Sequence, residues 1–145
     1  MPRVDFYITE DKQPDARLRL ACRVVEKGYL AEQRVLVWCG DQNTLDRIDE
    51  LLWTFGDSSF VPHEVVKADT PVALAPVSLT TDGPLAQHFD MLVNLAAAVP
   101  GIWRQCDRVA EILDGGETRA AGRERFRYYR EHGTEPETHR IGRPR

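Results

Sequence analysis

The chain has 145 residues, of which 42% are hydrophobic and 29% are charged, and its formal net charge at pH 7 is −4. This length favours a single domain, and the lack of an 18-residue apolar run argues against a membrane span. The three cysteines are too few and too widely spaced for a disulfide framework or a zinc site, which favours a reducing, cytoplasmic location.

The first half of the chain alternates between strand and helix patterns. Val4–Thr9 is a β-branched and aromatic run that predicts a strand, and Pro14 and Asp15 then open a helix with a one-sided apolar stripe. Arg34–Cys39 is almost continuously apolar, as in a strand covered on both faces, and Asp41 suits the N-cap of a second helix. The alternation predicts an α/β fold with a mostly parallel sheet and helices on both faces.

The second half is less regular. Pro71 and Pro76 bracket the run VALA, which VSLT continues, and either run predicts an edge strand. Met91–Ala97 and Arg108–Leu113 predict two further strands. A capping box of Asp114 and Glu117 is expected to start the last helix, and Gly133 to end it. Residues 1–133 are thus expected to form one α/β domain, followed by a flexible C-terminal tail over residues 134–145.

Charge is unevenly distributed along the chain. From Gly116 to Arg145 there are eight arginines and five glutamates, which gives this segment a charge of +3 and leaves −7 on residues 1–115. Arginine suits bidentate recognition of carboxylates and phosphates. The sequence therefore indicates a basic C-terminal surface on an acidic body, which either binds an anionic partner or simply solvates a helix.

The motifs of nucleotide-binding enzymes are missing. Neither GxxxxGK[ST] nor GxGxxG occurs, and the loop after the first strand, ITEDKQPDA, is acidic and free of glycine. The cysteines lie beside apolar residues, no two histidines are spaced as a metal pair, and the acidic helix face of Asp46, Asp49 and Glu50 is typical of a solvated surface. The sequence predicts no catalytic residue, cofactor or metal. A small α/β enzyme that handles nucleotides at the strand ends is the alternative.

Two surfaces are candidates for binding. On the last helix, residues spaced by three and four place four arginines around one aromatic: Arg119, Arg123, Phe126, Arg127 and Arg130. Such a cluster suits a peptide with carboxylates or a nucleic-acid phosphate, unless Phe126 is buried and the arginines only solubilise the helix. The second surface combines aromatic, apolar and proline residues after a helix: Leu52, Trp53, Phe55, Phe60, Val61 and Pro62. Protein interfaces favour such residues, although a small core under a long loop would use them too.

Four segments make the sequence recognisable: DFYI near the start, RVLVWC, DELLW with SFVPH, and RERFRYYREHG. With them the chain resembles the chi subunit of bacterial DNA polymerase III from about residue 4 to 133, most weakly over residues 64–88. The resemblance implies a non-catalytic accessory subunit of the clamp-loader complex, with a nucleotide-binding-like topology that lacks phosphate loops. The last dozen residues are unlike the short apolar ending of that family.

The resemblance also implies partners. Family members bind the acidic C-terminal tail of single-stranded DNA-binding protein, and they bind the psi subunit, which links them to the clamp loader. By motif, the tail-binding site is expected at Arg123 and Phe126, with Ile112, Arg119 and Arg127 beside them; the family usually has tyrosine at the place of Phe126. The psi surface is expected at Trp53, Phe60 and Pro62, where some members bind a repair helicase in competition with psi. With its acidic body, the chain is expected to contact DNA only indirectly, in the bacterial cytoplasm at the nucleoid.

Overall fold

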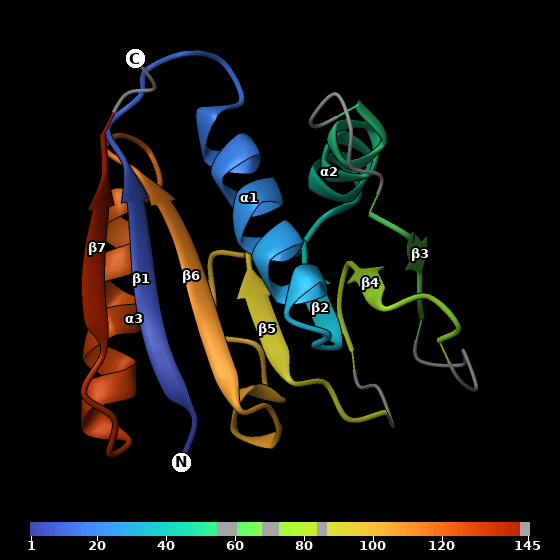
Figure 1. The fold of residues 1–145 in the computed structure, drawn as a ribbon. Coiled ribbons are helices and arrows are strands. Elements are labelled where there is room, and N and C mark those ends of the chain that lie inside the picture. Colours follow the sequence, from blue (N-terminus) through green and yellow to red (C-terminus); the bar gives the residue numbers. More distant parts are fainter. Residues whose placement is uncertain (55–60, 68–72, 84–86, 143–145) are drawn as a thin grey trace.

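The computed structural model describes residues 1–54, 61–67, 73–83 and 87–142. Within these ranges, seven strands form one sheet in the order β3-β4-β2-β5-β6-β1-β7, and all six pairs of neighbouring strands are parallel. Helices α1 and α2 lie over one face of the sheet and α3 over the other (Figure 1). The predicted α/β fold with a parallel sheet and helices on both faces is confirmed. No helix in the described ranges is long and apolar enough to cross a membrane.

The described elements follow the predicted alternation. The strands are β1 Arg3–Thr9, β2 Val35–Trp38, β3 His63–Val65, β4 Val77–Thr80, β5 Met91–Asn94, β6 Arg108–Asp114 and β7 Glu137–Ile141. The helices are α1 Ala16–Leu30, α2 Gln42–Thr54 and α3 Arg119–Glu131, with a 3₁₀ turn, η1, at Trp103–Gln105.

Side chains of each central strand alternate between the two faces of the sheet. In β6, Ala110 and Ile112 join the core under α1 and α2, whereas Val109 and Leu113 join the core under α3. Helix α3 approaches β6 closely at Gly122, where a Cβ atom would lie 2.5 Å from Cδ1 of Leu113. The position of α3 therefore depends on the absence of a side chain at Gly122.

The helix ends agree only in part with the predicted caps. Asp41 is the expected N-cap of α2, because its Oδ1 accepts the N–H of Thr44 at 2.7 Å. The capping box predicted for Asp114 is wrong: its carboxylate accepts the N–H of Gly116 and the hydroxyl of Thr118, and α3 begins only at Arg119. Gly133 follows the C-cap of α3 with φ of +95°, as predicted for a C′ glycine.

The prediction of a flexible tail is wrong for residues 137–141, because these residues form β7. This strand pairs with β1 from Asp5 opposite Glu137 to Thr9 opposite Ile141. Its side chains are exposed or half-buried, as expected at the edge of a sheet, so the sequence carries no strong apolar periodicity there. Residues 143–145 of the predicted tail lie outside the described residues.

The predicted edge strand is also placed differently. Val77–Thr80 forms β4, which pairs with β2 on one side and β3 on the other, so the edge is β3. Pro76 lies just before β4 and its carbonyl accepts the N–H of Val35 at 3.0 Å, so the proline ring does not interrupt the ladder.

Candidate functional site

An open hollow of about 500 Å³ lies on the outer surface of α3. Its lining consists of three arginines, an aromatic ring and one acid: Arg123, Phe126, Arg127, Arg130 and Glu131. Phe126 is half-buried, and its ring centroid lies 5.2 Å from that of Phe6 in β1. The hollow, referred to below as the α3 hollow, therefore has an apolar ring supported by the core and flanked by exposed cations.

The cations of the α3 hollow are largely available to a ligand. Arg127 lies 3.7 Å from Glu124, but both side chains are exposed, so this pair contributes little stability. Among the described residues, Arg123 and Arg130 make no ion pair and no side-chain hydrogen bond. The arrangement suits an anionic ligand that also carries an apolar group.

Three of the expected tail-binding residues come together here: Arg123, Phe126 and Arg127. Arg119, at the start of α3, instead lines a separate cleft at the carboxyl ends of the strands. The expectation that Ile112 lies beside Arg123 is wrong, because Ile112 is fully buried among residues that face α1. Alternate residues of β6 face α3, and these include Glu111 rather than Ile112.

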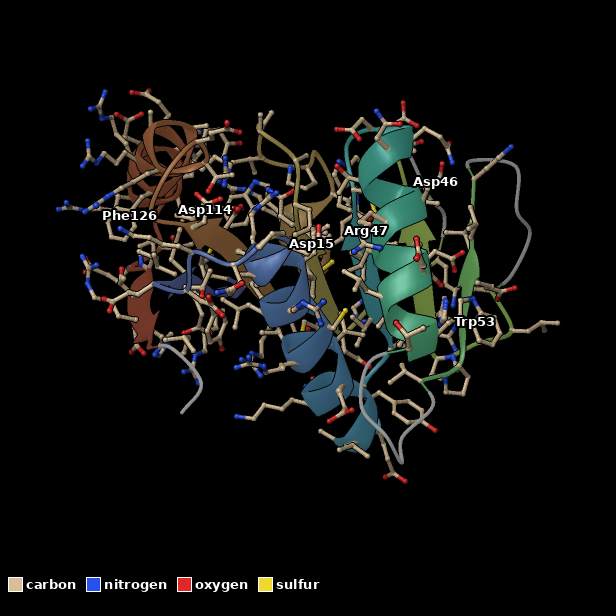
Figure 2. All side chains as sticks on the ribbon, turned by 90° about the horizontal axis from the view of Figure 1, so that it is seen from above. Asp15, Asp46, Arg47, Trp53, Asp114 and Phe126 are labelled. Carbon is tan, nitrogen blue, oxygen red and sulfur yellow. The ribbon has the colours of Figure 1, made fainter. Side chains whose placement is uncertain are left out.

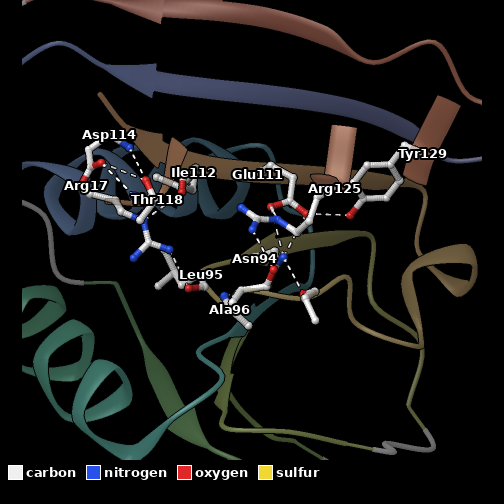
Figure 3. A network of polar contacts seen from close by, with 12 residues as sticks. Arg17, Asn94, Leu95, Ala96, Glu111, Ile112, Asp114, Thr118, Arg125 and Tyr129 are labelled. Atoms are coloured by element: carbon white, nitrogen blue, oxygen red, sulfur yellow. Dashed lines mark hydrogen bonds and ion pairs between the residues drawn. The ribbon is translucent and has the colours of Figure 1, made fainter. Parts of the chain in front are cut away.

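A buried polar network fixes α3 on the sheet (Figure 3). Glu111 is fully buried, and its carboxylate accepts hydrogen bonds from Arg125 Nε at 2.8 Å, Tyr129 Oη at 2.7 Å and Asn94 Nδ2 at 2.9 Å. Arg125 also donates to the carbonyl of Ala97 at 2.9 Å. Burial raises the pKa of Glu111, against the opposing effect of Arg125, and burial also raises the pKa of Tyr129. Since Arg125 and Tyr129 point inward, the network directs Arg123 and Arg127 outward.

Sequence reasoning missed this network, although two signals mark it. Glu111 is the one acid within the otherwise apolar run VAEIL of β6. Gly122, Arg125 and Tyr129 are spaced by three and four, which places them on the face of α3 opposite the exposed arginines. An acid in a buried strand and an arginine on a buried helix face together predict a buried pair.

The second candidate surface lies at the other end of the sheet, near the end of α2. Trp53 is 60% exposed, and its ring centroid lies 5.2 Å from that of His63, whose side chain is almost fully buried. Nε2 of His63 lies 2.8 Å from Oδ1 of Asp49, which holds the imidazole under the indole. Pro62 is half-buried beside this pair, and Phe60 lies outside the described residues.

Part of the predicted second surface belongs to the core instead. Leu52 and Val61 are each 1% exposed and pack in the cluster beneath α1 and α2. Phe55 lies outside the described residues. The candidate surface is therefore reduced to Trp53 and Pro62 among the described residues.

The cysteines and Arg17 have structural positions. The three cysteines are free and buried, and burial raises the pKa of Cys22 and Cys39 to about 12 and that of Cys106 to about 11. A cleft of about 820 Å³ at the carboxyl ends of β1 and β6 is lined by both acids and cations. Its most buried cation, Arg17 of α1, donates to the carbonyls of Ile112 at 2.9 Å and Leu95 at 2.6 Å, so it anchors the start of α1 to the carboxyl ends of β6 and β5 (Figure 3).

The chain matches a known protein family over residues 1–137, and the family is described as DNA polymerase III chi subunit, HolC. A relative from Pseudomonas aeruginosa is 38% identical over 144 residues, which cover 99% of both chains. A relative from Escherichia coli is 26% identical and one from Haemophilus influenzae 23% identical, each aligned over at least 90% of both chains. All three are named DNA polymerase III subunit chi. The resemblance read from the sequence is thereby confirmed, and the chain belongs to the DNA polymerase III chi subunit family of accessory replication subunits.

Proposed function

We propose that this chain is a non-catalytic bridge in bacterial DNA replication, acting in the cytoplasm at the nucleoid. In this proposal the α3 hollow binds the acidic C-terminal tail of single-stranded DNA-binding protein, and the Trp53 surface binds the psi subunit of the clamp loader. The observation that carries the proposal is the separation of the two surfaces. Helix α3 lies behind β6, β1 and β7, whereas α2 lies beside β4 at the other end of the sheet (Figure 1), and Phe126 and Trp53 lie at opposite ends of the molecule (Figure 2).

The chemistry of the α3 hollow fits an acidic tail that ends in an aromatic residue. Guanidinium groups of Arg123, Arg127 and Arg130 can pair with side-chain carboxylates and with the terminal carboxylate, and these charge-assisted hydrogen bonds are among the stronger ones in proteins. Phe126 offers an apolar contact for the terminal ring. Because the cations are exposed, we expect modest affinity that falls with salt, since exposed charges are screened within about 10 Å at 0.1 M.

The Trp53 surface fits a protein partner. An indole that is 60% exposed and held from below by a buried imidazole is a rigid apolar anchor, and tryptophans of this kind often dominate binding energy. We place Phe60 and Pro62 in the same interface by motif. A repair helicase that used this surface would exclude psi and leave the α3 hollow free.

A titration with tail peptides tests the first half of the proposal. Arg123→Ala should weaken the binding of an acidic peptide with a C-terminal aromatic residue by about 1.5–3 kcal/mol, the range for hydrogen bonds to charged groups. Arg119→Ala is the matched control on the same helix, and it should have little effect because Arg119 lines another cleft. Equal losses in both variants, or equal affinity for a peptide without its terminal aromatic, would contradict tail recognition.

A three-component experiment tests the bridge. A saturating concentration of psi should leave the affinity for the tail peptide unchanged within twofold. Trp53→Ala should weaken the binding of psi by about 2 kcal/mol or more, while binding of the tail peptide is retained. Competition between psi and the tail peptide would reject two separate surfaces. Binding of a stoichiometric nucleotide at micromolar affinity would instead favour a nucleotide-handling enzyme.

A further inference from the structure

A second groove, of about 360 Å³, lies on the face of the sheet opposite α3. It runs along α1 and is lined by Tyr7, Leu20, Arg23, Val24, Lys27, Gly28, Ala31, Gln33, Met91, Arg108 and Ile141. On this face α1 contacts β1 but lies mainly over β6, so β7 and the outer part of β1 lie open beside α1 in Figure 1. The groove, referred to below as the α1 groove, therefore opens onto an uncovered part of the sheet.

The floor of the α1 groove is apolar and firmly held. Leu20, Val24 and Met91 are buried, and Tyr7 is half-buried beside them. Helix α1 approaches the sheet so closely at Gly28 that a Cβ atom there would lie 2.8 Å from Cγ2 of Val35 and 3.2 Å from Cε of Met91. The groove thus lies between elements whose spacing is fixed by packing.

The rim of the α1 groove is positively charged. Three of its described lining residues are cations, Arg23, Lys27 and Arg108, and none is an acid. Arg23 and Lys27 are exposed and one helical turn apart, so they lie on the same side of α1. Within the described ranges neither of these two makes an ion pair or a side-chain hydrogen bond.

The third cation is held in place at the sheet. Nη2 of Arg108 donates to the hydroxyl of Tyr7 at 3.3 Å and lies 3.6 Å from Oδ2 of Asp5. Asp5 is fully buried and also contacts Arg3 Nε at 3.1 Å and His139 Nε2 at 2.9 Å. One buried carboxylate therefore contacts three basic groups, and among the described residues Glu137, 3.7 Å from Arg3, is the other acid that reaches them. Arg3 and Arg108 thus balance Asp5 and Glu137, and Arg23 and Lys27 leave the lining of the groove positively charged.

We propose that the α1 groove binds an acidic peptide segment of a partner protein, which inserts one bulky apolar side chain over Val24 and Tyr7. Carboxylates flanking that side chain pair with Arg23 and Lys27, and Arg108 closes the other wall. The volume is near the lower end of the about 300–1,000 Å³ found for ligand sites, which suits one side chain better than a cofactor. The site is separate from the α3 hollow, because α1 and α3 cover opposite faces of the sheet.

The test uses fluorescence anisotropy with a labelled ten-residue peptide of Asp and Glu that carries one central Leu. Its C-terminus is amidated, so it lacks the terminal carboxylate proposed for the α3 hollow. The double variant Arg23→Glu with Lys27→Glu should lower the affinity for this peptide at least tenfold. The matched control, Lys12→Glu with Arg119→Glu, makes the same change of charge at the separate cleft by the strand ends and should weaken binding of the peptide no more than twofold. All four side chains are exposed, and thermal melts should confirm that both variants fold.

Four results would overturn the proposal. Similar losses in the two double variants would show non-specific attraction, and no loss in either would show that the groove is not used. Equal binding of a peptide whose central Leu is replaced by Ser would remove the apolar anchor. Tighter binding of an oligothymidylate of the same charge, with the same sensitivity to Arg23→Glu and Lys27→Glu, would identify a nucleic-acid site in place of a peptide site.

Discussion

The buried ion pair of Glu111 and Arg125 beneath α3 allows a quantitative prediction of stability. Glu111→Gln preserves the size of the side chain but removes the only acid that the described structure places against Arg125. All three partners of Glu111 donate hydrogen bonds to it, so the amide of a glutamine would direct an N–H toward at least one donor. Nη2 of Arg125 already has no hydrogen-bond partner within the described residues, and apart from Glu111 its guanidinium donates there to the carbonyl of Ala97.

The magnitude follows from this geometry. Removing one partner of a buried ion pair lowers the free energy of unfolding by about 3–5 kcal/mol. Because the glutamine Oε1 can still accept a hydrogen bond from Arg125, we expect a loss of about 3 kcal/mol for Glu111→Gln. For a chain of this size, that corresponds to a melting temperature lower by roughly 6–12 °C. Tyr129→Phe removes a single hydrogen bond to a charged group, and it should cost about 1.5–3 kcal/mol.

Urea unfolding followed by tryptophan fluorescence provides the assay. The ring centroid of Trp103 lies 5.1 Å from that of Tyr129, so one indole reports on the packing of α3. Glu124→Gln is the control, because Glu124 is exposed on the same helix, and it should change stability by no more than about 0.5 kcal/mol. A loss of less than 1 kcal/mol for Glu111→Gln would refute the reasoning that this pair holds α3 in place.

Three further predictions concern the remainder of the fold. The hydrogen bond from Arg47 lowers the pKa of Asp15 in the folded protein. The stability that this bond contributes is therefore present above the ordinary aspartate pKa of about 3.9, and it is lost as the pH falls through the lower pKa of the folded state. Asp15→Asn should destabilise the protein at pH 7 but equal the parent in stability in acid, and a stability difference that grew in acid would contradict this. Gly122→Val should lower the free energy of unfolding by about 1–3 kcal/mol, because it forces a side chain against Leu113. Ala120→Val introduces the same β-branched residue at an exposed position of the same helix, and equal losses of stability in urea would disprove the close packing. The three buried thiols should resist iodoacetamide at pH 8 until urea unfolds the chain, and rapid labelling of the folded protein in a mass spectrum would argue against their burial.

Much of the sheet could be predicted because buried parallel strands are apolar on both faces. Val35, Leu36 and Val37 are fully buried, and their unbroken apolar run is sufficient to mark a central strand. The edge strands carry no such signal. In β7 the residues Glu137–Ile141 are polar except for the last, so only pairing with β1, far away in the sequence, makes this segment a strand.

The candidate site could be predicted as a stripe but not as a hollow. Helical spacing correctly grouped Arg123, Phe126 and Arg127, yet it could not show that Arg119 belongs to another cleft, since that depends on where α3 meets the sheet. The same spacing did not show that Arg125 differs from its neighbours. Its burial depends on Glu111, and two residues on separate elements become a pair only in three dimensions.

The pairing of β7 with β1 also determines the order in which the chain can fold. His139 and Asp5, which are in contact, lie 134 residues apart in sequence, and contacts between such distant residues form late and slow folding. Synthesis proceeds from the N-terminus, so β1 keeps one edge unpaired until residues 137–141 have been made. A growing chain that stops before β7 has every arginine of α3, but the strand whose Phe6 lies under Phe126 still has an unpaired edge.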